Sequence, residues 1–499
     1  MHVGEFLLIV IQLLNNVWLG RTAGMEVTPA QLLLRRKILV VSLDGFGHDY
    51  LTKYQWQHLS NLYAHGSYPY RFRNQFVTKT FPNHFSVATG MYEEAHGVVG
   101  NNVYEPQLKQ TFEVSDAELF TQNPHVSPIW TLNEEHGGHS GCIMWPGCDF
   151  AYRGKNVTFW SPYHERAALK ESIDTSIQWF TNEQTPANLI FLYHEEPDHL
   201  GHIYGPNSSQ VLKELKKIDE DIGYLYHMLQ LHGLKDTVDV IILSDHGMSA
   251  VKEENIIDLN AIVDHDLYNT SGNSPMLQVW TTPENFKVVY SHLMKRIKTE
   301  KYMVYLNSDD KLKSWHFTNN TRISEITLLA EEGYVFQDFK KYIEGIKNSG
   351  LSDLTDTHGD HGYPVDVPSM EPIFVAVGPS FKQGFEALEF SNIDVYLLLC
   401  HMLYLPPGPH NGTFDHINSI LMEPVSSMLI LPVTISLGCL VVLVGLIGFL
   451  ITRSKRKPVS AEALISGYVH RKAKRGGKEP LQDISEEECL LDAEVVDEV

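Results

Sequence analysis

The chain has 499 residues, 43% of them hydrophobic and 20% charged, a balance typical of globular proteins and not of disordered ones. Acidic residues outnumber Lys and Arg by 61 to 39, and the net charge of −22 argues against a protein that binds nucleic-acid polymers through a basic surface. The five cysteines are too few for a disulfide-dense scaffold.

The amino terminus has the composition of a secretory signal peptide. Residues 6–14 read FLLIVIQLL, and small residues follow at 22–24. This apolar run is too short to span a bilayer. We therefore predict a signal peptide over residues 1–24, with a buried N-terminal helix as the alternative.

A second apolar segment near the carboxyl end is long enough to cross a membrane. No charged residue lies between Glu423 and Arg453, and residues 428–451 are mostly apolar, as in a tilted transmembrane helix. The basic run RSKRK follows it directly, which places that flank in the cytoplasm. We predict a single-pass type I protein of the cell membrane, with an extracellular domain at 25–425, a transmembrane helix at 428–451 and a cytoplasmic tail at 452–499.

The tail also contains a short sorting pattern. Glu486 precedes the pair Leu490 and Leu491 by four positions, which resembles the dileucine signal that endocytic adaptors bind. An accidental match is the alternative, because such short patterns recur by chance.

Glycosylation sequons and cysteines agree with a secreted domain. The sequons all precede the predicted membrane helix and begin at Asn156, Asn207, Asn269, Asn319 and Asn411. Cys142 and Cys148 are close enough in sequence for a local disulfide, whereas Cys400 lies in an apolar run typical of a buried thiol.

Four short apolar runs are typical of buried parallel strands. They cover residues 38–43, 189–193, 238–243 and 373–377. Between the second and the third, apolar residues recur at helical spacing from Val211 to Leu229. A strand, a helix and a strand in this order form a right-handed parallel crossover. We therefore predict an α/β fold with a mainly parallel central sheet flanked by helices.

Potential metal ligands follow three of these strands and recur in a later glycine-rich segment. In open α/β sheets, ligands bind beyond the carboxyl ends of the strands. Each residue taken alone is equally well explained as a turn or helix-cap residue. Together they suit two divalent ions, most naturally zinc. The residues are Asp44, Asp198, His202, Asp245, His246 and His361.

The segment 79–90, KTFPNHFSVATG, is typical of a helix that begins near Thr80. Pro82 suits the first helical turn, and Gly90 suits the end. Thr80 would then lie at or beside the N-cap, where a capping role is the common explanation. The same position faces backbone N–H groups that favour phosphate, so we also consider the hydroxyl as a nucleophile.

Six ordered segments between Lys37 and Asn411 give the chain a family resemblance. They read SLDGF, KTFPNH, HGVVGNNVYEP, EEPDHLGH, SDHGM and GDHGY. In this order they resemble the ectonucleotide pyrophosphatase/phosphodiesterases of the alkaline phosphatase superfamily, and the compact, membrane-anchored fourth and fifth types most of all. The resemblance implies an alkaline-phosphatase-like fold.

The resemblance also implies roles for individual residues. One zinc ion would be held by Asp198, His202 and His361, and the other by Asp44, Asp245 and His246 together with the nucleophile Thr80. Asn101 would bind a phosphate oxygen, and Phe81 and Tyr163 would sandwich a nucleobase. His358 is expected to support the site without binding metal.

The implied activity is that of an extracellular zinc-dependent nucleotide pyrophosphatase/phosphodiesterase. Dinucleotides, NAD-like compounds or nucleoside triphosphates would be cleaved through a nucleotidyl-threonine intermediate to release a nucleoside monophosphate. One alternative is a choline-lysophospholipid phosphodiesterase, in which Trp160 and Tyr163 face a quaternary ammonium group. Another is a cell-surface glycoprotein with mainly a binding role.

Overall fold

The structure is a computed structural model, and it describes residues 36–422. The predicted signal peptide, membrane helix and cytoplasmic tail, with its dileucine pattern, lie outside the described residues and stay predictions. Within residues 36–422, every helix is too short or too polar to cross a membrane.

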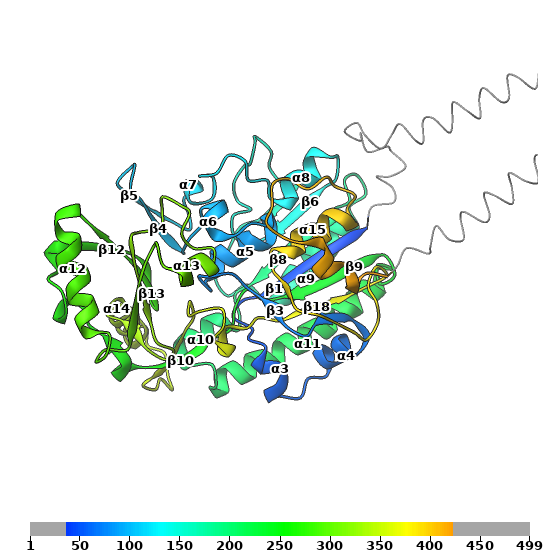
Figure 1. Cartoon of the computed structure of the whole chain (residues 1–499). Helices are drawn as coiled ribbons and strands as arrows, with labels where there is room; N and C mark the ends of the chain where they lie inside the picture. Colours follow the sequence, from blue (N-terminus) through cyan, green and yellow to red (C-terminus); the bar gives the residue numbers. More distant parts are fainter. Residues whose placement is uncertain (1–35, 423–499) are drawn as a thin grey trace, which may run out of the picture. The chain divides into compact units, whose positions relative to one another are not determined.

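An eight-stranded sheet forms the centre of the described region (Figure 1). Its strands lie in the order β19 (Phe385–Ala387), β2 (Ser67–Pro69), β18 (Phe374–Val377), β9 (Val238–Leu243), β1 (Lys37–Leu43), β8 (Leu189–His194), β6 (Ser140–Ile143) and β7 (Phe159–Ser161). The central strands β1, β8 and β9 run parallel, and their side chains are almost all buried. Helices cover both faces of the sheet, so successive side chains of these strands are buried whichever way they point. Continuous runs of Val, Ile and Leu are typical of such strands for this reason.

One predicted strand direction is wrong. We expected residues 373–377 to form a parallel strand, but β18 pairs antiparallel with β9, with Phe374 opposite Leu243. The backbone N–H of Ser244, just after β9, donates to Ile373 O at 3.1 Å. The chain therefore enters β18 at the edge where β9 ends, and it must run back across the sheet.

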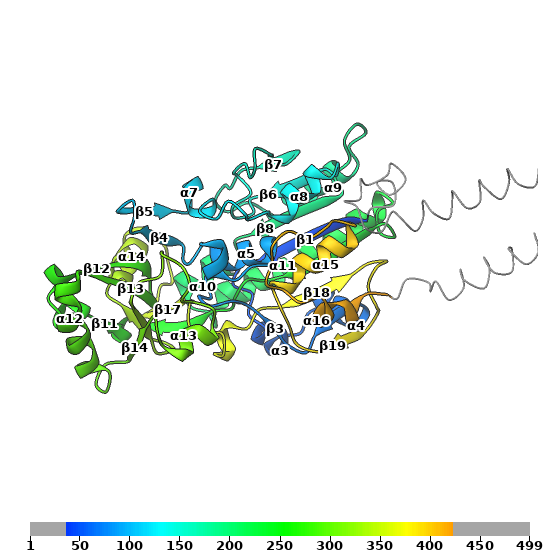
Figure 2. The same ribbon diagram turned by 45° about the horizontal axis from the view of Figure 1, so that its top comes forward.

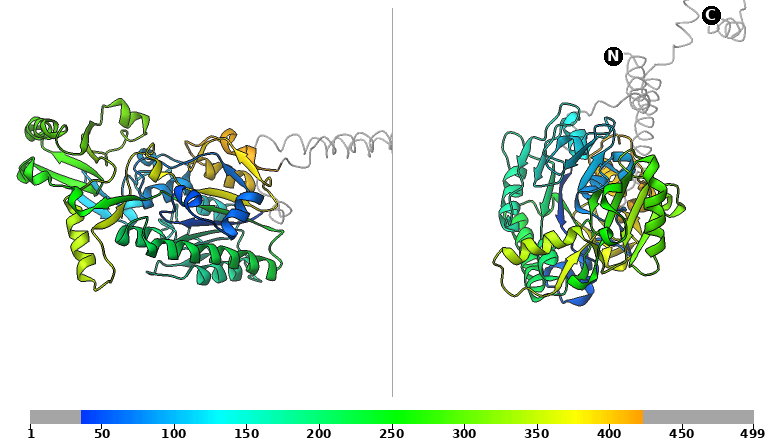
Figure 3. Two further views of the ribbon diagram at one scale, coloured as in Figure 1. Left: turned by 90° about the horizontal axis from the view of Figure 1, so that it is seen from below. Right: turned by 90° about the vertical axis from the view of Figure 1, so that its left-hand side faces the viewer.

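Helices cover the two faces of this sheet (Figure 3). On one face, α11 (Ser209–Leu231) packs beside α9 (Leu169–Phe180). The predicted helix between the second and third strands is α11, and Ser208 caps it by accepting a hydrogen bond from the N–H of Val211. On the other face, α5 (Thr80–Thr89), α8 (Ile129–Glu135) and α15 (Asp394–Met402) pack together.

Between β9 and β17 (Thr357–Asp360), the chain forms a second, antiparallel sheet that the sequence analysis did not foresee (Figures 1 and 2). Its order is β12 (Tyr268–Asn273), β13 (Met276–Thr281), β15 (Ile326–Ala330) and β14 (Tyr302–Leu306). The helices α12 (Pro283–Arg296) and α14 (Asp338–Asn348) belong to the same insertion. It has its own hydrophobic cluster, built around Leu277, Val289 and Leu328. After the insertion, β17 pairs with β10 (Ser249–Lys252) in a separate two-stranded sheet, and the chain then re-enters the main sheet at β18.

The covalent and surface features of the described region agree with the sequence analysis. Cys142 and Cys148 form a disulfide, and Cys400 is a buried free thiol. The side chains of all five sequon asparagines are exposed, namely Asn156, Asn207, Asn269, Asn319 and Asn411. Their glycosylation stays a prediction.

The buried face of α11 should carry much of the stability of this layer. Leu215 is 0% exposed, whereas Leu231 on the same helix is 66% exposed. We expect Leu215→Ala to lower the free energy of unfolding by about 2–5 kcal/mol, because it removes buried contacts and leaves a cavity. Denaturant unfolding of a protein that comprises residues 25–425 measures this. Leu231→Ala is the control and should change the free energy by less than about 0.5 kcal/mol. Equal effects of the two substitutions would show that α11 is not packed as described.

Candidate active site

The predicted metal ligands meet at one edge of the central sheet. Asp44 follows β1, and Asp245 with His246 follows β9. Asp198 opens α10 (Asp198–Tyr204), shortly after β8 ends. Because the three strands are parallel neighbours, their carboxyl ends bring these side chains together.

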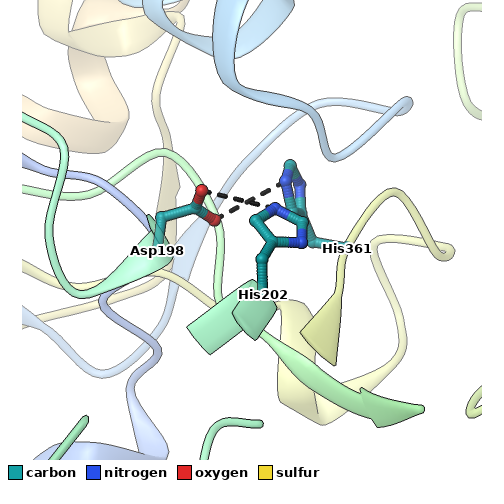
Figure 4. Close-up of side chains that lie close together, drawn as sticks. All are labelled: Asp198, His202 and His361. Atoms are coloured by element: carbon teal, nitrogen blue, oxygen red, sulfur yellow. Dashed lines mark ion pairs between the residues drawn. The ribbon is translucent and has the colours of Figure 1, made fainter. Parts of the chain in front are cut away.

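One cluster consists of Asp198, His202 and His361 (Figure 4). Asp198 and His202 are four residues apart on α10 and therefore share one face of the helix. The Nε2 atom of His202 lies 3.3 Å from Asp198 Oδ2, and the Nε2 atom of His361 lies 3.6 Å from Asp198 Oδ1. His361 directly follows β17, which is distant in sequence from α10 and lies beside it only in the folded chain.

A second cluster consists of Asp44, Asp245 and His246. The Nε2 atom of His246 lies 3.4 Å from Asp44 Oδ1 and 3.0 Å from Asp245 Oδ2. The hydroxyl oxygen of Thr80 lies 3.2 Å from the same Nε2 atom. The two clusters are adjacent, since the rings of His246 and His361 stack with their centroids 3.5 Å apart.

The carboxylates of both clusters have the chemistry of cation ligands. Asp44 Oδ1, Asp198 Oδ1 and Asp245 Oδ2 are buried, and none of them accepts a hydrogen bond from the described residues. Burial and then the neighbouring carboxylates Asp245 and Asp198 raise the pKa of Asp44 well above its usual range. Such a group of acids needs a positive charge among its members to stay ionised. The residues present therefore fit divalent cations.

The imidazoles are oriented in the same way. In each ring, Nδ1 lies at hydrogen-bond distance from a backbone carbonyl, which can only accept. The carbonyls are Gly359 for His202 at 2.8 Å, Thr78 for His361 at 2.9 Å and Gly247 for His246 at 3.0 Å. With Nδ1 as the donor, Nε2 is the atom directed at the cluster. This arrangement is typical of metal-binding histidines.

His202 interacts with Asp198 most strongly. Burial by itself lowers the pKa of His202, but the adjacent Asp198 carboxylate outweighs it and raises the pKa to about 9. For Asp198 the effects have the opposite sign. Burial raises its pKa, but His202, with smaller contributions from His246 and Lys79, outweighs burial and lowers the pKa below its usual value. A cation between them would take the place of the Nε2 proton.

Thr80 is the first residue of α5 and lies beside the N-cap residue Lys79, as the segment predicted. The helix ends at Gly90 in the left-handed conformation, with φ of 68°. A Cβ atom there would meet the ring of Tyr396 at 2.8 Å, so both the backbone and the packing require glycine. The Thr80 side chain is 6% exposed and is held at the edge of the second cluster.

Of the predicted substrate-binding residues, Asn101 and Phe81 lie at this helix start. Asn101 Oδ1 accepts a hydrogen bond from the N–H of Phe81 at 3.2 Å, so both residues lie next to Thr80. Tyr163 is 54% exposed, and its hydroxyl donates to Glu195 Oε2 at 2.5 Å. Its ring is therefore open to solvent, and its predicted pairing with Phe81 stays a prediction. Trp160 is 50% exposed, and its ring N–H donates to Asp149.

Several supporting residues escaped the sequence analysis. The Tyr193 hydroxyl donates to Asp44 Oδ2 at 2.5 Å. The ring of His84 bridges Thr80 O at 2.7 Å and Ser42 Oγ at 2.8 Å. Two sequence signals could have identified them. Tyr193 lies near the end of β8, and His84 lies one helical turn after Thr80. His358 is buried and contacts Ile203 O and Glu253, outside both clusters, and its supporting or structural role stays a prediction.

A buried lysine ties the insertion to the helix start. Lys79 is 2% exposed, and its ammonium group lies 3.2 Å from Asp360 Oδ1 and 2.7 Å from Ser274 O. Ser274 belongs to the turn between β12 and β13, and its N–H and hydroxyl both donate to Asp338 at the start of α14. The residues directly before Thr80 and before His361 are therefore fixed against each other and against the insertion.

A cavity of about 750 Å³ adjoins the first cluster. His202 and Asp360 form part of its wall, and Phe339 and Tyr342 of α14 and Arg166 form other parts. The ring of Tyr342 contacts His202 edge-on, with centroids 5.9 Å apart. The cavity thus gives room for a bound molecule next to the paired clusters.

Comparisons with known proteins agree with this geometry. The family described as Type I phosphodiesterase / nucleotide pyrophosphatase matches residues 38–364. The human bis(5'-adenosyl)-triphosphatase ENPP4 is 34% identical over 428 residues, which cover 85% of this chain and 90% of that protein. Human ectonucleotide pyrophosphatase/phosphodiesterase family member 5 is 33% identical over 389 residues, with 78% of each chain covered.

Solved structures extend the similarity to the fold. Human ectonucleotide pyrophosphatase/phosphodiesterase 5 superposes with a TM-score of 0.71 at 34% identity, covering 78% of this chain and all of that one. An inactive threonine-to-alanine variant of the murine protein, in complex with AMP, gives 0.70 at 33% identity with the same 78% coverage. Both similarities cover 78% of this chain, and they support the α/β fold with its mixed central sheet. The chain therefore belongs to the phosphodiesterase/nucleotide pyrophosphatase family of hydrolases.

Proposed function

We propose that the protein is an extracellular two-zinc phosphodiesterase that cleaves nucleotides through a covalent intermediate on Thr80. The observation that carries the proposal is the Thr80 hydroxyl, 3.2 Å from His246 Nε2 at the edge of two adjacent ligand clusters. Mixed Asp and His ligands favour zinc over magnesium or calcium, which prefer oxygen ligands alone.

The Asp198, His202 and His361 cluster would hold one divalent ion and the Asp44, Asp245 and His246 cluster the other, and such ions would supply the positive charge that neutralises the phosphate. Thr80 loses its hydroxyl proton to solvent and Oγ1 attacks the phosphorus atom in line, so that a new P–O bond forms to Thr80. The P–O bond to the leaving phosphate breaks, and the leaving oxygen keeps the electron pair. Water then attacks the nucleotidyl-threonine, which releases a nucleoside monophosphate and restores the hydroxyl. The Asn101 side chain accepts a hydrogen bond from the N–H of Phe81 through Oδ1, and its Nδ2 group would donate to a phosphate oxygen.

The similarity to a bis(5'-adenosyl)-triphosphatase and to a structure in complex with AMP supports a nucleotide substrate. Phe81 would contact the nucleobase from the Thr80 side, and Tyr163 from the solvent side. The cavity beside His202 offers space for the remainder of a dinucleotide, an NAD-like compound or a triphosphate. Five exposed sequons and the disulfide support an extracellular domain, which the predicted helix at 428–451 would anchor.

Two alternatives share this architecture. One differs in its substrate, and the other has no catalytic activity. A choline lysophospholipid would need Trp160 and Tyr163 as an ammonium site, and both rings are half-exposed. Turnover of an adenine dinucleotide measured against a choline lysophospholipid distinguishes the two. A purely binding glycoprotein would turn over neither and would contain no zinc.

We expect Thr80→Ala to keep the fold and the bound metal but to lower kcat by about 10⁴- to 10⁶-fold, as loss of a nucleophile does. Thr80→Ser should retain measurable turnover because it keeps the oxygen. Steady-state kinetics on a phosphodiester, with elemental analysis of both variants, measures this. Near-normal turnover by the alanine variant would remove Thr80 from the mechanism.

Metal content should follow the two clusters separately. We expect about two zinc ions per extracellular domain, and about one in each of Asp245→Asn and His361→Ala, because each substitution removes a ligand of a different cluster. Elemental analysis of dialysed protein provides the count. His358→Gln is the matched control, since this buried histidine lies outside both clusters, and it should keep both ions. Full metal content in both ligand variants would contradict the assignment.

Substrate selectivity should depend on the ring of Tyr163. Base–aromatic stacking contributes about 1–3 kcal/mol, so Tyr163→Ala should raise KM for a nucleotide diester by about 5- to 150-fold. A small chromogenic phosphodiester without a base should be affected much less. Tyr163→Phe keeps the ring and loses only the hydrogen bond to Glu195, and its KM should stay close to that of the unmodified enzyme. Equal losses on both substrates would rule out the stacking role.

A further inference from the structure

A second pocket lies apart from the two ligand clusters, among α3 (Asp49–Lys53), α4 (His58–His65), β3 (Phe72–Arg73) and the outer strands of the main sheet. Its volume is about 320 Å³, at the lower end of the range of small-molecule sites. None of its lining residues belongs to the metal clusters or to the substrate residues described above.

Aromatic side chains from several segments supply half of its lining residues. Trp56 and Tyr63 come from α4 and the turn before it, Tyr68 and Tyr70 from β2 and its end, and Phe72 and Phe374 from β3 and β18. The rings meet in pairs at steep angles. The planes of Tyr63 and Tyr68 lie at 51° with centroids 5.0 Å apart, and those of Phe72 and Phe374 at 47° with centroids 5.2 Å apart. Phe72 and Phe374 are buried in the hydrophobic core at the base of the pocket, whereas Tyr63 and Tyr68 are partly buried and Tyr70 is exposed, so the tyrosines are the rings that a ligand can reach.

The charge of the pocket is negative. Glu386 is the acidic residue in its wall, and among the described residues that line it there is no Lys or Arg. Glu386 lies opposite Tyr68 in the parallel pairing of β19 with β2, so the carboxylate and this ring project from adjacent positions of the sheet. Tyr70 is 73% exposed at the same edge, which leaves the pocket open to solvent.

We propose that this pocket binds an organic ammonium group, with the aromatic faces contacting the alkyl groups and Glu386 providing the counter-charge. An ammonium ion is attracted by the negative faces of aromatic rings, and alkyl substitution reduces the hydration that it must lose. An anion is disfavoured by Glu386. A neutral apolar ligand of the same size gains the packing but neither electrostatic contribution.

Choline and 3,3-dimethylbutan-1-ol form a matched pair of probes, because they have nearly the same shape and differ in charge. We expect choline to bind the full-length protein at least about 5-fold more tightly than the neutral alcohol, as measured by isothermal titration at pH 8, where imidazoles are uncharged. Equal affinities for choline and the neutral alcohol would show that the pocket does not recognise the positive charge, and would overturn the proposal. Absence of choline binding would do the same.

Variants locate the bound probe. Tyr68→Ala should weaken choline binding by about 2- to 30-fold, the range for one cation–π contact, and Glu386→Gln by about 2- to 5-fold. Glu389→Gln is the matched control, since Glu389 pairs with Arg73 outside the pocket, and it should leave binding unchanged. None of these substitutions should alter nucleotide turnover. Loss of choline binding in Tyr163→Ala with full binding in Tyr68→Ala would place the ammonium group in the catalytic site and refute the proposal without affecting the proposed function.

The ammonium group could belong to a free metabolite or to a lipid headgroup. Vesicles of phosphatidylcholine, compared with vesicles of phosphatidylglycerol, test the second source. Retention on phosphatidylcholine alone, lost in Tyr68→Ala, assigns a headgroup. Choline binding without vesicle retention assigns a soluble ligand, and failure of both measurements overturns the proposal.

Discussion

The burial of three carboxylates beside three histidines is the constraint on which the rest of this structure depends. Asp44, Asp198 and Asp245 each hold one oxygen without a hydrogen-bond donor among the described residues. Removing such groups from water is costly unless cations replace the lost hydration. The parallel strands β1, β8 and β9 make the arrangement achievable, because they end side by side and present their following residues at one edge.

The surrounding contacts keep these ligands in place. Backbone carbonyls fix the Nδ1 side of each imidazole, and Tyr193 fixes the second oxygen of Asp44. Two further backbone N–H groups, from Gly45 and His246, occupy Asp245 Oδ1 and leave only Oδ2 for the cluster. The ligand atoms are therefore oriented by the fold itself, which limits how far they must move when an ion binds.

The insertion completes the site from the other side. Through Lys79, Asp360 and Ser274, it is joined to the residues that directly precede Thr80 and His361. The positive charge of Lys79 is balanced by Asp360 and buried with it. This contact therefore fixes the positions of three segments, those of Lys79, Asp360 and Ser274, relative to one another. It also places α14 over His202, which creates the cavity next to the clusters. The geometry for positioning a substrate thus comes from both parts of the described region.

Much of this site was readable from the sequence, since its signals are local. Apolar runs predicted β1, β8 and β9, and the acidic and histidine residues directly after them predicted the ligands. The helix start at Thr80 followed from Pro82 and Gly90. Each of these inferences depends on residues within about one turn or one strand of each other.

Only the tertiary structure decided how distant segments meet. The direction of β18 depends on where the chain enters the sheet, and the local apolar pattern is the same for parallel and antiparallel strands. The stacking of His246 on His361, the ion pair of Lys79 with Asp360 and the enclosure of the aromatic pocket join residues far apart in sequence, through contacts that leave no periodic trace. The sequence by itself identified the candidate ligands and the chemistry that they favour, because these residues directly follow recognisable strands or recur in short motifs. The spatial adjacency of the two clusters, and the cavity beside them, were decided by the long-range packing of the sheet against the insertion.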